Sequence, residues 1–344
     1  MKLHESSQDF KDAIEATAQA LKLRPVFVEK DYWVTYVLKN LSKSQFANQV
    51  VFKGGTSLSK AYGCIKRFSE DIDLAILNPA DYSGGQVKGL LKTITQNIAG
   101  NLTEISNHAA TKKFGKIRAT VYSYPKVIKD ANYGVVSDNI QIEINSMANP
   151  VPYVVRPIRC YIAQYLESAG LLKEITDYEL EQFDLQVLSL QRTYFEKVLS
   201  VNRLSYDLED GLVKKVRHFY DIHQLHHHPE LAGNILTQGS FPILNDARTD
   251  DEENRTMDGA WKGQLLGQSP LFTDIEATWQ KVNKEYRTGL QDLLWEDEAP
   301  SPEAIQTTLG EIKVFVEDFD KHHPPQVKTE AQKDEQPTED KVEE

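Results

Sequence analysis

The segment from residue 50 to residue 76 constrains the fold of this chain more than any other. Residues 50–52 are apolar and β-prone, two glycines follow at positions 54 and 55, and residues 56–62 have helical spacing. In residues 72–76, isoleucine and leucine then alternate with aspartate and alanine, which gives a strand with one apolar face. The order strand, glycine turn, helix and strand predicts a core of the α/β class.

Further helices and strands surround this segment. Apolar residues recur at helical spacing in residues 8–22 and 25–41, and a longer helical pattern covers residues 87–105. Residues 116–124 are β-prone, and isoleucines alternate with polar residues over 140–144. The first half of the chain therefore mixes helices with strands.

The second half of the chain is mostly helical. Thr193 and Glu196 have capping-box spacing, so we expect them to open a helix that carries Lys197. Residues 212–225 have the pattern of a further helix. Residues 324–344 contain three prolines, no aromatic residue and many charges, and because they have little apolar area to offset chain entropy, we expect them to be disordered.

Charge and composition exclude several classes of protein. The 39 Lys and Arg against 51 Asp and Glu give a net charge of −12, of which the last segment, with seven acids and three lysines, carries −4. Contact with nucleic acid must therefore be local. No run approaches the roughly 20 apolar residues of a membrane span, and the first residues lack a signal-peptide pattern, so we expect a cytoplasmic protein. The two cysteines, Cys64 and Cys160, exclude a disulfide scaffold or a zinc module.

The glycine turn and three carboxylates carry the strongest chemical signal. Gly54 and Gly55 precede a helix whose first N–H groups can bind an anion such as a triphosphate. Asp71 and Asp73 project from one strand face, where they can hold one or two Mg²⁺ ions, and Glu143 can supply a third carboxylate. Such a site can activate a hydroxyl and neutralise a leaving pyrophosphate. Each motif alone is commonly only a turn or a solvated strand face, so the prediction depends on their combination.

This combination resembles a known signature. Residues 53–60, KGGTSLSK, and 67–74, RFSEDIDL, are similar to the motifs of the AbiEii/AbiGii toxin family, which are nucleotidyltransferases of the DNA polymerase β-like superfamily. The resemblance covers roughly residues 25 to 230 and includes residues 29–32, the strand around Glu143, and residues 193–197 and 217–221.

The resemblance implies a fold. Members of the family have a small mixed sheet flanked by helices and a helical C-terminal part that completes the nucleotide cleft. We therefore expect N-terminal helices in residues 1–45, a nucleotidyltransferase core in 46–150, a mainly helical domain in 151–323 and a disordered acidic tail in 324–344.

The resemblance also implies a function. Members are the toxic half of toxin–antitoxin or phage-defence (abortive infection) pairs, and some are thought to transfer a nucleotide from an NTP to RNA, notably tRNA. We expect the same here, with Mg²⁺ or Mn²⁺ as the cofactor and a cognate antitoxin as a partner. Transfer to a protein side chain or a small molecule, or a catalytically silent module that binds a nucleotide or an antitoxin, remain alternatives. The sequence leaves the NTP, the acceptor and the oligomeric state undetermined.

The family's motifs assign roles to individual residues. The resemblance implies that Lys197 contacts the triphosphate and that Asp221 is the polar residue of the last motif. The expected catalytic residues are Asp71, Asp73, Lys197 and Asp221; the nucleotide-binding residues are Gly54, Gly55, Thr56, Ser57, Arg67, Ser69 and Lys197; and the metal ligands are Asp71, Asp73 and Glu143.

Three of these residues also have ordinary structural explanations. Lys197 has the pattern of a solvated helix lysine, and Glu143 shares its strand face with other polar residues. Asp221 lies four residues after Arg217, a spacing that is common in surface ion pairs.

A basic stretch and a histidine cluster complete the candidates. Residues 111–129 contain six Lys and Arg, no acid and three aromatic residues. This composition suits a single-stranded RNA end, although a solvated β-hairpin explains it equally well. His223 and residues 226–228 indicate a polar helix end, because no carboxylate or cysteine at fixed spacing completes a metal site. The candidate RNA contacts are Lys112, Lys113, Lys116, Arg118 and Tyr122.

Overall fold

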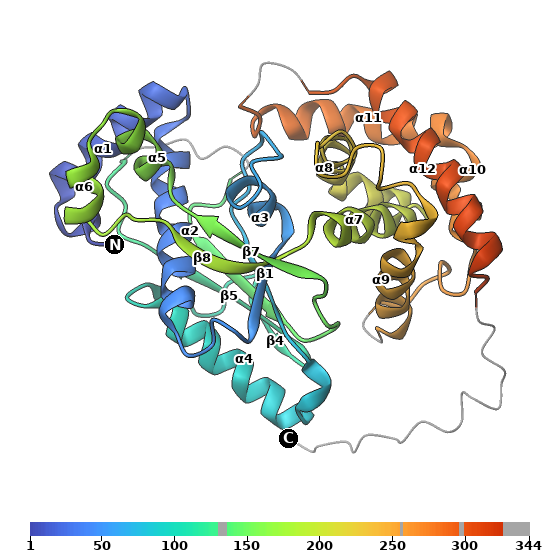
Figure 1. Ribbon diagram of the computed structural model, residues 1–344, viewed down its shortest axis with the longest axis horizontal. Coiled ribbons are helices and arrows are strands. Elements are labelled where there is room, and N and C mark those ends of the chain that lie inside the picture. Colours follow the sequence, from blue (N-terminus) through green and yellow to red (C-terminus); the bar gives the residue numbers. More distant parts are fainter. Residues whose placement is uncertain (130–135, 255–256, 296–298, 326–344) are drawn as a thin grey trace.

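The computed structural model describes residues 1–129, 136–254, 257–295 and 299–325. A twisted sheet lies between helices from the N-terminal half on one side and the helices from residue 190 onward on the other (Figure 1). This arrangement confirms the expected mixed α/β fold. The predicted acidic tail lies outside the described residues from position 326. No helix in the described ranges is long and apolar enough to cross a membrane.

The sheet has eight strands in the order β3-β5-β6-β2-β1-β8-β7, with β4 paired to β5. Strand β2 runs parallel to β6, and β1 runs parallel to β8, whereas the other pairs are antiparallel. The strands are β1 (Val50–Lys53), β2 (Ile72–Ile76), β3 (Thr103–Glu104), β4 (Lys112–Phe114), β5 (Ile117–Ser123), β6 (Ile140–Asn145), β7 (Tyr153–Ile158) and β8 (Phe183–Leu188).

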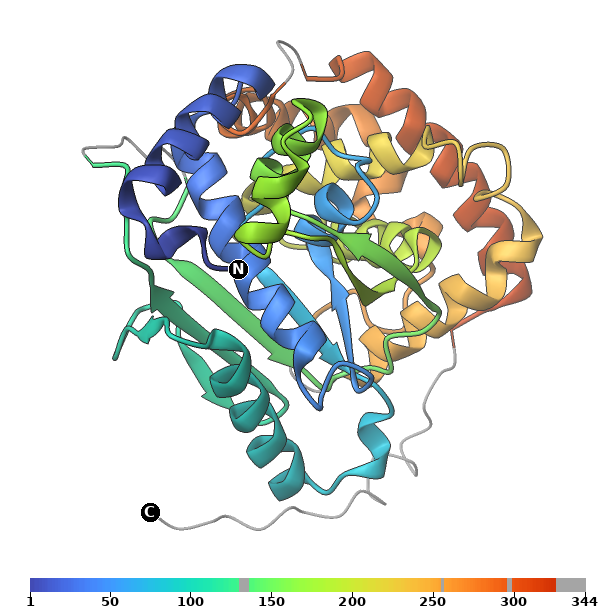
Figure 2. The same ribbon diagram turned by 60° about the vertical axis from the view of Figure 1, so that its left-hand side comes forward.

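The described part of the chain has twelve α-helices. Figure 2 shows that the helices α2 and α4 cover the same face of the sheet. The helices are α1 (Ser7–Leu21), α2 (Pro25–Lys43), α3 (Gly54–Lys60), α4 (Gly84–Ala99), α5 (Tyr161–Ser168), α6 (Leu172–Asp177), α7 (Leu190–Leu204), α8 (Arg217–His226), α9 (Phe241–Glu253), α10 (Pro270–Thr273), α11 (Ile275–Gln291) and α12 (Pro302–His322).

Local sequence explains most of these boundaries. Pro25 occupies the first turn of α2, where its missing N–H costs nothing. Helix α4 ends at Ala99 rather than at the predicted residue 105, because Gly100 adopts a positive φ of 58°. The capping-box prediction for α7 is wrong: the side chain of Ser189 caps that helix by accepting a hydrogen bond from the N–H of Arg192.

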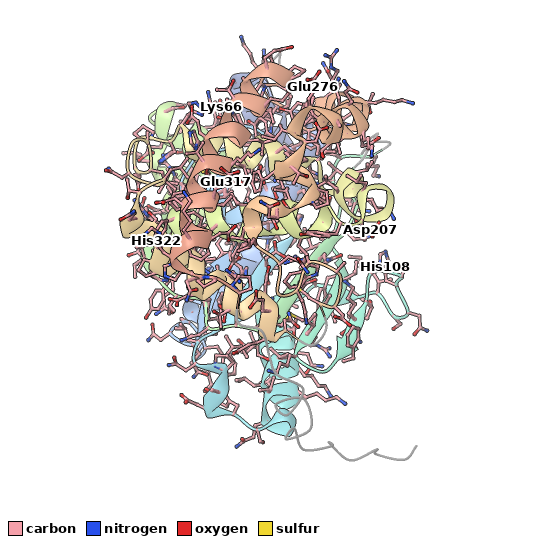
Figure 3. The ribbon with its side chains drawn as sticks, turned by 90° about the vertical axis from the view of Figure 1, so that its right-hand side faces the viewer. Lys66, His108, Asp207, Glu276, Glu317 and His322 are labelled. Atoms are coloured by element: carbon pink, nitrogen blue, oxygen red, sulfur yellow. The ribbon has the colours of Figure 1, made fainter. Side chains whose placement is uncertain are left out.

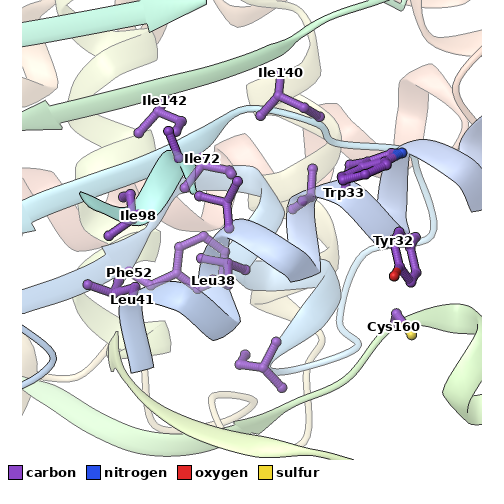
Figure 4. Close-up of a cluster of buried hydrophobic side chains, with 14 of the residues drawn as sticks. Tyr32, Trp33, Leu38, Leu41, Phe52, Ile72, Ile98, Ile140, Ile142 and Cys160 are labelled. Atoms are coloured by element: carbon purple, nitrogen blue, oxygen red, sulfur yellow. The ribbon is translucent and has the colours of Figure 1, made fainter. Parts of the chain in front are cut away.

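The apolar face of the sheet and the helices α2 and α4 form the first core. The isoleucines of β2 and β6 point to this face, as their alternation predicts, and each buried isoleucine contributes about 1.5–3 kcal/mol. Figure 4 shows part of this core, with side chains from α2 lying against those of the sheet. The labelled core residues include Trp33, Leu38, Leu41, Phe52, Ile72, Ile98, Ile140 and Ile142.

A second core lies within the helical half. It joins apolar side chains from α7, α8, α11 and α12 to Leu58 of α3 and to Cys64 and Ile65. Figure 3 shows α12 crossing the surface on this side of the molecule, where His322 is exposed. Because β7 and β8 complete the sheet, the domain boundary expected at residue 150 falls inside the sheet, and the helical half begins with α7.

Helix α2 holds the segment that leads into β2. Lys30 is fully buried and forms an ion pair with Glu70. Asp31 accepts hydrogen bonds from Lys60 Nζ at 2.5 Å and from the backbone N–H of Tyr161 at 2.8 Å. Buried charges require such partners, so Lys30 holds the residue directly before Asp71, and Asp31 ties α2 to α3 and to the start of α5.

Candidate functional site

Three charged residues form a row across the sheet. Lys53 of β1 lies directly opposite Asp73 of β2, and Asp73 lies in register with Glu143 of β6. Residues in register on neighbouring strands point to the same face. Their chain neighbours, such as Ile72 and Ile142, enter the first core, so the row faces the opposite side, toward the helical half.

The two glycines allow α3 to begin against this row. Gly54 has a φ of 78°, and a Cβ at this position would lie 2.0 Å from Asp73 Oδ2. A Cβ on Gly55 would lie 2.6 Å from Ser69 Oγ and 2.9 Å from Arg67 Nη2. Only glycine combines this backbone conformation with such close approach. The glycine turn and the segment from Arg67 to Asp73 are therefore one packed unit.

The hydroxyl groups that follow the glycines are used inside the protein. Thr56 and Ser57 are buried. Thr56 Oγ1 donates to Ser69 Oγ at 3.1 Å, and Ser57 Oγ donates to the carbonyl of Gly54 at 2.9 Å. These bonds fix the turn, and the expectation that Thr56 and Ser57 bind a nucleotide stays a prediction.

The carboxylates carry unbalanced negative charge. Burial, and after it the nearby charges of Asp71 and Glu143, raise the pKa of Asp73 to about 7, against the opposing effect of Lys53 and Lys197. Asp71 is exposed at the start of β2. Carboxylates under mutual repulsion suit a hard divalent cation. Among the described residues, no three Asp, Glu, His or Cys side chains lie close enough together to hold a metal ion. The carboxylates are therefore of the right chemical type for a divalent cation, but their side chains are not arranged around a common point.

A buried ionic group lies at the start of the helical half. Asp221 is fully buried and accepts hydrogen bonds of 2.7 Å from Arg67 Nε, Arg67 Nη2 and Lys197 Nζ. Burial alone would raise the pKa of Asp221, but Arg67 and Lys197 hold it well below its usual range. The alternative explanations for Lys197 and Asp221 are wrong: Lys197 is buried rather than solvated, and Asp221 pairs with Arg67 rather than with Arg217.

A second ionic chain joins the sheet to α7 and α9. Lys53 Nζ donates to Glu196 Oε2 at 2.8 Å, and Arg192 Nε donates to Glu196 Oε1 at 3.2 Å. Arg192 also pairs with Asp250 of α9. The sequence did not predict these ion pairs. Local hints to them were that Lys53 precedes the two glycines and that Glu196 precedes Lys197.

The two ionic groups border one pocket of about 460 Å³. Gly54 and Glu143 belong to its sheet side, and Lys197 of α7 and His218 of α8 belong to its helical side. The structure thus brings together the glycine turn, a carboxylate of the row and the lysine expected to bind a triphosphate. Arg67 and Asp221 lie behind the pocket and act on Lys197 from within the protein.

The basic stretch forms a hairpin beside the pocket. Lys112, Lys113 and Lys116 are exposed, and Ser146, next to the pocket-lining Asn145, donates its N–H to the carbonyl of Lys116 at 3.0 Å. Lys113 forms an ion pair with Glu104.

Two of the expected RNA contacts do not reach the surface. Tyr122 is only 3% exposed and lies in the first core, so its ring offers no face for base stacking. Arg118 is 9% exposed. The expectation for these two side chains is therefore corrected, because β5 is buried between its neighbours and α4.

The histidine cluster joins helices. His223 Nδ1 lies 2.9 Å from Thr308 Oγ1, and His226 bridges Tyr194 and Glu311 at 3.0 and 2.8 Å. These contacts tie α8 to α12 and α7. They agree with the prediction of a polar helix end.

A mixed sheet that carries carboxylates beside a glycine turn, faced by a helical half that supplies a buried lysine, is the arrangement expected of a nucleotidyltransferase. The model of the family described as nucleotidyl transferase AbiEii toxin, type IV TA system, matches residues 36–307, and the chain belongs to this family. It is a nucleotidyltransferase toxin of a type IV toxin–antitoxin system, and membership implies an NTP substrate and an antitoxin partner.

Among solved structures, the chain is similar to MenT4, a nucleotidyltransferase toxin from Mycobacterium tuberculosis H37Rv. The sequence identity is 16% and the TM-score is 0.45, over 90% of this chain and 99% of that chain. No curated protein matches the chain.

Proposed function

We propose that this toxin transfers a nucleotide from an NTP to RNA, such as tRNA, with a divalent cation at the carboxylate row. The observation that carries the proposal is that Glu143, Gly54 and Lys197, which come from three distant parts of the sequence, border one pocket of about 460 Å³. That volume lies within the usual range for small-molecule sites, about 300–1,000 Å³.

Asp71, Asp73 and Glu143 are the residues that would hold Mg²⁺ or Mn²⁺. A bound divalent cation lowers the pKa of an attacking hydroxyl and neutralises charge on a leaving pyrophosphate. The raised pKa of Asp73, which has its origin in burial and in the two neighbouring carboxylates, supports this assignment because a cation would relieve the repulsion.

Lys197 binds the triphosphate as a point charge. Its Nζ is already oriented by Asp221 at 2.7 Å, and Asp221 is in turn held by two hydrogen bonds from Arg67. Gly54 keeps the wall next to Asp73 free of side-chain atoms. These residues bind and orient the NTP so that its α-phosphate faces the acceptor hydroxyl.

The exposed lysines of the hairpin support RNA as the acceptor. Lys112 and Lys113 lie on β4, and Lys116 lies in the turn directly before Ile117, which lines the pocket. A local basic surface at the edge of an acidic protein can attract a phosphate backbone toward the pocket. In the cell, the cognate antitoxin would oppose this activity. Inactivation of the modified RNA would stop growth of an infected cell, which is how abortive infection limits a phage.

Labelling of total RNA tests the proposal. The protein is incubated with Mg²⁺ and each α-³²P-labelled NTP in turn, with total RNA from a bacterial host, and Asp73→Asn serves as the matched inactive protein. We expect label in RNA with wild type only. Label in protein or in a small molecule would show that the acceptor is that molecule and not RNA. If no NTP gave label in any acceptor, a catalytically silent binding module would be favoured.

A further inference from the structure

His218 is a pocket residue to which the site described above gives no role. It lies on α8, three residues before Asp221, and lines the pocket together with Lys197. The side chain is half-buried. An imidazole at this position is within reach of whatever occupies the lysine side of the pocket.

The charges around His218 are mainly positive. Lys197 of α7, Lys215 before α8 and Arg67 from the segment before β2 repel a proton on the ring, and Asp221 attracts one. Burial and then Lys197 lower the pKa of His218 well below its usual value. The ring is therefore neutral at pH 7 in the protein without a nucleotide.

The ring also has unused hydrogen-bonding capacity. Nδ1 is buried and has no hydrogen-bond partner among the residues that the structure describes. A buried polar atom without a partner costs about 1–3 kcal/mol. The other histidines of α8 differ in this respect, because His223 and His226 both have side-chain partners on α12.

We propose that His218 takes up a proton when an NTP enters the pocket, and that the imidazolium then binds the triphosphate beside Lys197. This inference rests on the proposed function. A triphosphate bound beside Lys197 places negatively charged oxygens next to the ring, and these favour the protonated imidazole over the neutral one. The proton comes from the buffer when the NTP binds, and it returns there after pyrophosphate leaves.

The protonated ring has a direct use in the reaction. A hydrogen bond from an imidazolium to a phosphate oxygen is charge-assisted and stronger than a neutral one. Negative charge grows on the pyrophosphate as its bond to the α-phosphorus breaks, so a cation placed there stabilises the transition state more than the ground state. His218 thus adds a positive charge that is present only while the triphosphate is bound.

His223 provides a matched control on the same helix. It is half-buried like His218, and burial together with His227 and His226 lowers its pKa to about 4. It contacts Thr308 of α12 and does not line the pocket. Replacement of either histidine by glutamine removes a titratable ring and keeps a polar side chain.

Proton uptake on nucleotide binding tests the inference. Calorimetric titrations with the α,β-methylene analogues of ATP, GTP, CTP and UTP, with Mg²⁺, are carried out at pH 7 in two buffers of different ionisation enthalpy. The difference in heat gives the number of protons bound. We expect wild type and His223→Gln to take up the same number and His218→Gln to take up fewer, by up to about one proton. Between pH 8 and pH 6, the affinity of wild type should improve relative to His218→Gln by up to about tenfold per pH unit.

The outcomes separate this inference from the proposed function. Equal proton uptake in wild type and His218→Gln, with normal analogue binding, overturns the role of His218 and leaves the nucleotidyltransferase site intact. Failure of every analogue to bind the folded wild type overturns the proposed site and this inference together. If His218→Gln does not fold, the ¹³C-labelled ring of His218 in wild type replaces it: its signal should move to the imidazolium position on analogue binding, and an unchanged signal refutes the proposal.

Discussion

Replacing Asp73 by asparagine should stabilise the metal-free toxin while it abolishes transfer. The pKa of Asp73 is raised from 3.8 to about 7. A carboxyl group whose folded-state pKa is raised binds a proton more tightly in the folded protein, so its stabilising contribution is present at low pH and is lost as the pH rises through 7. Asparagine is neutral and has nearly the same volume. At pH 8 the variant should be more stable than wild type by up to about 4 kcal/mol, because each tenfold change in proton affinity corresponds to about 1.4 kcal/mol.

Urea denaturation in EDTA at pH 5, 6, 7 and 8 measures this difference. The advantage of Asp73→Asn should be largest at pH 8 and shrink toward pH 5. Asp71→Asn is the comparison variant: Asp71 is exposed, so its replacement removes only its repulsion of Asp73 and should stabilise the toxin at pH 8 by less than Asp73→Asn does. Mg²⁺ should stabilise wild type and leave Asp73→Asn unchanged, and both variants should lose transfer. If Asp73→Asn is no more stable than wild type at pH 8, the electrostatic account of the carboxylate row is wrong.

Three further predictions concern the two sides of the pocket. Lys197→Ala should reduce NTP-induced stabilisation in a thermal-shift titration with Mg²⁺, since it removes a point charge from the triphosphate; an undiminished shift would remove Lys197 from the site. Asp221→Asn should lower the free energy of unfolding in urea by about 3–5 kcal/mol, because it leaves two cations buried without their shared carboxylate; a loss below about 1 kcal/mol would contradict this. Changing Lys112, Lys113 and Lys116 to glutamate should weaken RNA binding and flatten the slope of log affinity against log salt by roughly 0.7 per lost contact to a single strand. NTP binding should stay unchanged in that variant, and an unaltered salt slope would leave the hairpin without a role in RNA binding.

Local patterns predicted the strands of the catalytic sheet well. The alternation in residues 72–76 and 140–144 correctly gave both the strands and the face that enters the core. The pairing of these two strands joins residues about 70 positions apart, and no local signal specifies such a register. The row of Lys53, Asp73 and Glu143 could therefore be assembled from the sequence only through the resemblance to a family.

Other errors have identifiable causes. Strand β7 was missed because its residues do not alternate: Val154 and Val155 are both exposed at the edge of the sheet, and Pro157 interrupts the pattern. Arg192 was not expected in the interior, since charged residues are normally exposed. It is 2% exposed because Glu196 and Asp250, from two helices, supply its partners.

In the proposed site, the contact between Asp221 and Lys197 preorganises the toxin for its NTP. A free lysine side chain loses up to about 2 kcal/mol of rotamer entropy when it is ordered by a ligand. Here that ordering takes place during folding, because the carboxylate of Asp221 holds the ammonium group before any nucleotide arrives. Affinity for NTP is thereby tied to the integrity of the fold, and a loosened helical half should lose nucleotide binding before it unfolds.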